Sequence, residues 1–225
     1  MKRWYLKSKL RWCTLRATHH TITDYYQCMA DIFSKPLSET RLMAVDLEMT
    51  GLNSQFDQIL SIGIVPIYNG LLQLANAKQI LVSIDGSVGD SATIHGIVDR
   101  QLETAVSAKT AMEWFLKQTQ GHVLVAHHAP LDLSFLKAEI HRCYGEPITF
   151  IAIDTLLLEK RRLLLRHELI KEGSLRLDAC RARYGLPVYA AHDATVDALA
   201  CGELLLAQMA AIAGQGQLRL IDLVQ

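Results

Sequence analysis

The stretch that decides the fold is LMAVDLEMTGL, residues 42–52, in which two acidic side chains follow an apolar run. The apolar run predicts a buried β-strand. Alternate residues of a strand point to the same face, so Asp46 and Glu48 project together. Two carboxylates on one buried face repel each other, so either a cation meets them or they lie at a solvated strand end. For an isolated pair of acids, the solvated strand end is the commoner explanation.

The composition is that of a single globular domain rather than a disordered or membrane-spanning chain. Half of the 225 residues are hydrophobic, and 23 Lys and Arg balance 23 Asp and Glu, so no global charge attracts a polyanion. The five cysteines are scattered without a CxxC motif, which is typical of reduced thiols in a cytoplasmic protein. The basic N-terminus lacks the apolar run of a secretory signal, and charges interrupt the leucine-rich stretch at 156–169, so we expect no membrane span.

The order of elements predicts an α/β fold with a mixed five-stranded sheet. The first three strands follow each other with short joins, and Asn69-Gly70 is a hairpin signal between the second and the third. Helices and strands then alternate, so an antiparallel meander is followed by parallel strands and the sheet is flanked by helices. The expected strands are 41–49, 58–70, 71–84, 122–128 and 148–156, and the expected helices are 107–121, 131–145, 156–169, 174–185 and 192–214.

The chain divides into a basic N-terminal extension (1–40), a main domain (41–213) and a C-terminal tail (214–225). Six Lys or Arg precede the first acid, Asp24, and Trp4, Tyr5 and Trp12 lie among them. The extension could be a nucleic-acid arm that combines charge with stacking, or a helical segment docked on the domain. We favour docking, because this many aromatic residues are unusual in a freely solvated tail.

Two later stretches carry further acids. VLVAHHAPLDLSFL places Asp132 just after a buried strand at the start of a helix, where an acid commonly serves as a helix cap. AAHDATVDALACGELLLAQM places His192 at a helix start and Asp197 within an otherwise apolar helix. Asp193 precedes Asp197 by one helical turn, so their repulsion also requires relief.

Taken in order, these motifs resemble those of the DEDD exonucleases, in the histidine-bearing branch. That is the family of the epsilon proofreading subunit of bacterial DNA polymerase III. The similar parts are DxE followed by Thr-Gly-Leu, then VAHHAPLDLSFL, then His-x4-Asp, with ATIHGI at 92–97 and IDTL at 153–156 between them. The similarity extends from about residue 41 to about residue 210. The resemblance implies a ribonuclease H-like fold.

The resemblance also implies a role for each of the acids. It makes Asp46, Glu48, Asp132 and Asp197 the metal-binding carboxylates and His192 the general base. Two Mg²⁺ or Mn²⁺ ions suit this set, because these ions prefer hard oxygen ligands and can serve both ends of a phosphodiester displacement. A histidine titrates near neutrality and can accept the proton of the attacking water. Bound metal would also explain how a neutral protein holds a polyanion.

A second group of residues is expected at the terminal nucleotide. The family's pattern points to His95 in HGI and to the acid before it, Asp90, and to Thr50, Gly51 and Leu52 in the turn after the first strand. Without the resemblance, these residues would be a loop histidine with a capping aspartate and an ordinary strand-end turn.

The second motif departs from the family, which usually has Asn where this chain has His128. EMTGL also replaces the commoner ETTGL. Neither change touches the carboxylates, so the departures concern substrate preference rather than activity. His127 and His128 are adjacent on a strand and face opposite ways, so we expect one core and one rim histidine rather than a shared ion.

The sequence therefore predicts a metal-dependent 3′→5′ exonuclease that releases nucleoside monophosphates from single-stranded or frayed DNA. One alternative keeps the chemistry but acts on short RNA or RNA 3′ ends, because DLEMTGL also begins the oligoribonuclease branch. The other is a non-catalytic nucleic-acid-binding module, which would be expected to lack at least one of the four carboxylates. The tail QLRLIDL, at 217–223, loosely resembles a peptide that inserts into sliding clamps, although a packed helix end is the commoner explanation for its leucines.

Overall fold

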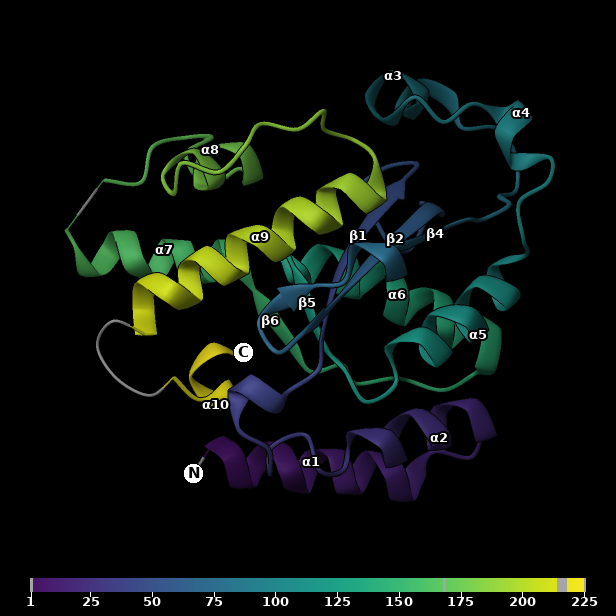
Figure 1. Cartoon of the computed structure of the whole chain (residues 1–225). Helices are drawn as coiled ribbons and strands as arrows, with labels where there is room; N and C mark the ends of the chain where they lie inside the picture. Colours follow the sequence, from purple (N-terminus) through teal and green to yellow (C-terminus); the bar gives the residue numbers. More distant parts are fainter. Residues whose placement is uncertain (1, 168, 214–217, 225) are drawn as a thin grey trace.

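The computed structural model describes residues 2–167, 169–213 and 218–224 as a mixed sheet flanked by helices (Figure 1). The strands are β1 (Leu42–Met49), β2 (Ile59–Tyr68), β3 (Leu71–Leu72), β4 (Lys78–Leu81), β5 (Val123–Ala126) and β6 (Ala152–Asp154). Their order is β3-β2-β1-β5-β6, with β4 also paired to β2. β1 is antiparallel to β2 and parallel to β5, and β5 is parallel to β6. The expected meander followed by parallel strands is confirmed.

The expected third strand is the one element that the structure divides. Asn69 and Gly70 form the predicted hairpin, with φ of 52° and 72°, but β3 ends after two residues. A 3₁₀ turn (Leu74–Asn76) separates β3 from β4. The cause lies in β2, where the Pro66 carbonyl accepts from the Gln73 N–H but Pro66 has no N–H to return. The prediction of one strand over 71–84 was therefore wrong.

Helices cover the sheet. α9 lies across β1, β2 and β5, while α6 contacts β5 and β6 and packs against α5. The helices are α1 (Lys2–Arg16), α2 (His20–Met29), α3 (Ala92–His95), α4 (Asp99–Leu102), α5 (Ala108–Thr119), α6 (Ala129–Tyr144), α7 (Thr155–Leu165), α8 (Leu177–Ala182), α9 (Ala194–Ala213) and α10 (Leu220–Leu223). Further 3₁₀ turns lie at Leu37–Glu39 and Gly89–Ser91.

One described helix, α9, is long and apolar enough over Ala194–Ile212 to cross a membrane by length and composition. The expectation of no membrane span rested on the leucine-rich stretch at 156–169 and did not take α9 into account. α9 lies on the sheet, where Ala198, Cys201 and Leu205 are buried in the main core. Its apolar composition is therefore that of a core helix.

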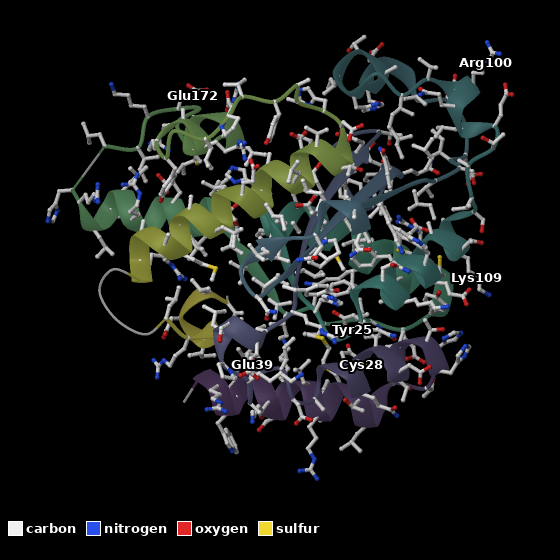
Figure 2. All side chains as sticks on the ribbon, in the orientation of Figure 1. Tyr25, Cys28, Glu39, Arg100, Lys109 and Glu172 are labelled. Carbon is white, nitrogen blue, oxygen red and sulfur yellow. The ribbon has the colours of Figure 1, made fainter. Side chains whose placement is uncertain are left out.

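The N-terminal extension forms two helices that pack on the domain, but not through the aromatic residues that favoured docking. Leu6 and Leu10 of α1 are buried, and Tyr25 of α2 reaches into the domain to meet Phe150 at a ring distance of 5.7 Å (Figure 2). The aromatic residues of α1 instead face solvent: Trp4, Tyr5 and Trp12 are all exposed. The argument from these three side chains was wrong, because the aliphatic face of α1 makes the contact.

The described part of the C-terminal tail packs on the sheet. Leu220, Leu223 and Val224 are buried, and Val224 forms an antiparallel bridge with Ile153. Gln217, the first residue of the possible clamp peptide, lies outside the described residues. The tail leucines thus contribute to the core, as a packed helix end would.

Candidate active site

The centre of the site is a cluster of carboxylates at the end of β1. Asp46 and Glu48 project from the same face of the strand, and Asp197 of α9 approaches them. One carboxylate oxygen from each of the three lies within 4.8 Å of the others. The strand register therefore produces the shared face that the sequence predicted.

The close approach of α9 to the sheet depends on a glycine in β2. Gly63 pairs with Asp46 across the antiparallel ladder. A Cβ on Gly63 would lie 2.2 Å from the carbonyl carbon of Ala194 and 2.4 Å from the backbone nitrogen of Thr195. The first turn of α9 thus rests directly on the strand backbone beside Asp46. Sequence reasoning missed this residue, although a glycine inside a strand is a recognised sign of close backbone approach.

The segment before α9 fixes the orientation of Asp197. The helix begins at Ala194, so His192 and Asp193 precede it rather than forming its first turn as expected. The Asp193 carboxylate accepts hydrogen bonds from the Thr195 and Val196 N–H groups, which makes it the cap of the helix. The His192 N–H donates to the Asp197 carboxylate at 2.7 Å. Asp193 therefore satisfies backbone N–H groups at the start of α9, and it also adds negative charge beside the cluster.

Asp132 enters the site from the first turn of α6. The helix starts after His128, which has a positive φ of 72° and donates its N–H to Asp154 at 3.1 Å. The backbone is left-handed at this position, and Asn adopts that conformation more readily than most residues other than Gly, which is consistent with the family's preference for Asn. His127 instead contacts Thr155 and the Leu175 carbonyl and is half-buried, whereas His128 is exposed. The expected rim histidine is therefore confirmed, but β5 ends at Ala126, so neither histidine lies on the strand and His127 is not fully in the core.

Asp132 lies close enough to the three clustered carboxylates for their charges to affect one another's pKa. Burial, then the charges of Asp132, Asp197 and Glu48, raise the pKa of Asp46 well above its usual range. Burial and the neighbouring Asp197 raise the pKa of Glu48 to about 7. Burial raises the pKa of Asp132 to about 8, with Asp154 and Glu48 adding to the shift. The pKa of Asp197 is also raised, chiefly by burial.

This charge set fits divalent metal ions. Among the described residues, none of the ion pairs includes Asp46, Glu48, Asp132 or Asp197. Buried carboxylates without cationic partners require a bound cation or bound protons. Convergent oxygen ligands are those that Mg²⁺ and Mn²⁺ prefer. Asp46, Glu48 and Asp197 can thus hold such an ion, and Asp132 remains a predicted further ligand.

We expect the stability of the metal-free protein to fall as pH rises. An acid with a raised pKa keeps its proton in the folded state at a pH where the unfolded chain has already released it. The free energy of unfolding therefore decreases as pH rises from about 4 to about 8. Thermal melting in EDTA should show a lower Tm at pH 8 than at pH 5.5, and Mg²⁺ should restore it at pH 8. Asp46→Asn removes one charge from the cluster, so its Tm should depend less on both pH and Mg²⁺. If Mg²⁺ does not raise the Tm of the wild type at pH 8, the metal site is contradicted.

Two histidines belong to the predicted site, and one of them, His192, contacts a carboxylate of the cluster. His192 is exposed, with a positive φ of 71°. His95 of α3 is buried, and burial together with the charge of His192 lowers its pKa. The His95 Nδ1 accepts from the Ile97 N–H, and its Nε2 has no partner among the described residues. His95 therefore lies close enough to His192 for their charges to interact.

The remaining candidates for substrate contact lie on loops. The Thr50 hydroxyl donates to Asp57 and accepts from the Gln58 N–H, so it holds the turn after β1 together. Gly51 sits against the Asp57 carboxylate, and Leu52 is exposed. Asp90 is exposed in the 3₁₀ turn before α3. These positions remain predictions as substrate contacts.

A cleft of about 750 Å³ opens onto the carboxylates. Asp46, Asp197 and His192 line it together with residues of the segment between α7 and α9. Arg181, which also lines the cleft, is buried and bonded to Glu203 at 2.8 Å. The cleft therefore leaves Asp46 and Asp197 accessible from the α8 side.

Comparison with known proteins identifies the family. The sequence pattern of the exonuclease family RNase_T matches residues 43–205. The DNA polymerase III subunit epsilon of Treponema pallidum is 31% identical over 170 residues, which cover 74% of this chain and 75% of the relative. An epsilon-like protein of Rhodobacter capsulatus is 30% identical over 191 residues, or 80% of this chain but 25% of that protein. A PolC-type DNA polymerase III of Thermotoga maritima is 31% identical over 75% of this chain and 12% of its own length.

Solved structures share the fold. E. coli exonuclease I in complex with a dA16 oligonucleotide superposes with a TM-score of 0.66 at 16% identity, over 82% of this chain and 42% of that one. Cell-death related nuclease 4 gives a TM-score of 0.66 at 16% identity, over 78% and 65% of the two chains. The ribonuclease H-like fold is thereby confirmed. The chain belongs to the exonuclease family and is a 3′→5′ exonuclease of the group similar to the epsilon subunit of DNA polymerase III.

Proposed function

We propose that the protein removes nucleoside monophosphates one at a time from the 3′ end of single-stranded or frayed DNA. The observation that carries the proposal is the convergence of Asp46, Glu48 and Asp197 within 4.8 Å, beside Asp132 and without a cationic partner among the described residues. Two bound Mg²⁺ or Mn²⁺ ions would supply charge stabilisation for the attacking and leaving oxygens of a phosphodiester.

The chain's own residues supply the rest of the reaction. Asp46 and Glu48 are fixed by β1, and Asp197 is fixed by the His192 N–H, so the ligand oxygens are in place before substrate arrives. The exposed His192 imidazole is the general base, which takes the proton of the attacking water. His95 of α3 and the exposed Leu52 contact the terminal nucleotide, whereas the Thr50 hydroxyl holds the turn after β1 together.

DNA is the proposed substrate because the relatives are named as DNA polymerase III subunits and a structural neighbour holds a DNA oligonucleotide. The same chemistry on RNA is the alternative that the experiment must separate. A clamp contact through the tail is not included in the proposal, since Leu220 and Leu223 are buried.

The polarity and product test the proposal. Matched DNA and RNA oligonucleotides labelled at the 5′ end should be incubated with the protein and Mg²⁺. We expect the DNA to give a descending ladder with release of mononucleotides, and a slower ladder from RNA. Faster digestion of RNA would reassign the substrate. Internal cuts, or cleavage of circular single strands, would contradict the exonuclease mechanism.

A further inference from the structure

The outward face of α1 carries an unusual set of exposed side chains. Leu6 and Leu10 bury the inner face, yet Trp4, Trp12 and Leu15 on the other side are 76%, 57% and 78% exposed. Figure 2 shows the side chains of α1 projecting away from the rest of the molecule. Large exposed aromatic residues on one short helix are uncommon in a protein without a binding partner at that surface. We call this surface, formed by Trp4, Tyr5, Lys9, Arg11, Trp12, Leu15 and Arg16, the outer α1 face.

The charge on the outer α1 face is entirely positive. No acid occurs in the sequence before Asp24. The Arg16 guanidinium lies over the Trp12 ring at 4.5 Å. Lys9 lies near Lys137 of α6, whose pKa is lowered by burial and by the charge of Lys9. Among the described side chains, no lysine or arginine of α1 takes part in an ion pair. An anionic partner would therefore be complementary to the charge of this face.

The arrangement of these residues selects among anionic partners. A symmetric contact between the outer α1 faces of two copies would bring like charges together, which disfavours such a dimer. Helices that lie on lipid surfaces separate a charged face from an apolar face. Here cations and aromatics alternate on one face, because Tyr5, Lys9, Trp12 and Arg16 follow each other at helical spacing of three or four residues. Aromatic rings interleaved with cations are the arrangement that binds single-stranded nucleic acid, through base stacking and phosphate contact.

We propose that the outer α1 face is a second binding surface for single-stranded nucleic acid. It lies outside the residues matched by the exonuclease family, 43–205, and α1 lies at the opposite end of the molecule from the start of α9 (Figure 1). The surface can thus hold a long strand without occupying the carboxylate site. Any effect of this surface on digestion rests on the proposed function, whereas its binding of a strand does not.

Tryptophan fluorescence tests this proposal without catalysis. Titration of the full chain with oligothymidylate in EDTA should quench emission, because Trp4 and Trp12 are two of the three tryptophans and stacking quenches them. Trp4→Ala/Trp12→Ala should weaken binding, measured by anisotropy of a labelled oligonucleotide, by about tenfold or more. Lys9→Gln/Arg11→Gln should reduce the magnitude of the slope of log affinity against log salt concentration by about 1.4, because each cation contributes about 0.7 on a single strand. Leu71→Ala, at an exposed apolar residue of β3, is the matched control and should leave affinity unchanged.

Digestion of a trinucleotide with Mg²⁺ separates this proposal from the proposed function, since so short a substrate cannot reach both surfaces. The α1 variants should digest it at the wild-type rate. Binding without digestion by the wild type would contradict the proposed function alone. Affinity unaffected by the double tryptophan variant, or quenching only by vesicles containing phosphatidylserine, would overturn the second binding surface.

Discussion

Replacement of His192 with asparagine is expected to reduce kcat by about a hundredfold to ten-thousandfold, the usual cost of losing a general base. The variant removes the imidazole but keeps the backbone N–H that donates to Asp197 at 2.7 Å. Asparagine also tolerates the positive φ of 71° at this position, so the segment before α9 should keep its shape. Metal affinity, measured by calorimetry, should stay close to that of the wild type.

Asp46→Ala provides the contrasting variant. Asp46 lies at the centre of the carboxylate cluster, so its loss should weaken metal binding as well as catalysis. The wild-type rate should fall on the acid side, because the base must be neutral to accept a proton and the carboxylates must be ionised to hold metal. If the His192→Asn variant keeps its kcat, or loses metal affinity as severely as Asp46→Ala, the general-base assignment is wrong.

Replacement of Gly63 with alanine is expected to reduce activity by about a hundredfold or more, although Gly63 touches neither metal nor substrate. Its new Cβ would meet the Ala194 backbone at 2.2 Å, and backbone cannot move aside as a side-chain end can. The first turn of α9 must therefore shift and carry Asp197 away from Asp46. A displacement of about 1 Å at a reacting centre is sufficient for a loss of this size, and the overpacked contact should also cost about 1–3 kcal/mol of stability.

Gly202→Ala is the matched control on the same helix. Its new Cβ would meet the end of the Leu72 side chain at 2.7 Å, which can rotate, and the Ala44 Cβ at 3.4 Å. We expect near-wild-type kcat from this variant, with helix propensity offsetting part of the crowding. Oligonucleotide digestion compares the activity of the two variants, and thermal melting compares their stability. Equal activity of Gly63→Ala and Gly202→Ala would show that the close contact between α9 and β2 does not position Asp197.

The parts of the molecule that follow from local pattern could be predicted from the sequence. The alternation of β1 places Asp46 and Glu48 on one face, and Asn69-Gly70 closes the hairpin, because both depend on a few neighbouring residues. The order of strands and helices similarly defined the mixed sheet. The site residues were assembled from distant motifs only through the resemblance to a family, since nothing local in the sequence shows that Asp132 and Asp197 meet.

The features that could not be predicted depend on contacts between distant segments. Pro66 interrupts the ladder opposite Gln73, which is visible only once the register of β2 is known. Gly63 matters because Ala194 rests on it. Asp193 caps α9 because the helix begins at Ala194, two residues later than its sequence pattern suggested. Trp4 and Trp12 face solvent because the aliphatic side of α1 meets the domain.

The central claim is that the carboxylate cluster hydrolyses nucleic acid with bound divalent metal. The most direct measurement is digestion of 5′-labelled single-stranded DNA by the wild type and Asp46→Asn, each with Mg²⁺, with Mn²⁺ and with EDTA. We predict rapid digestion by the wild type with either metal, none in EDTA, recovery when excess Mg²⁺ is restored, and loss in the variant under all conditions. Full digestion by the wild type in EDTA, or wild-type rates from Asp46→Asn, would contradict the account.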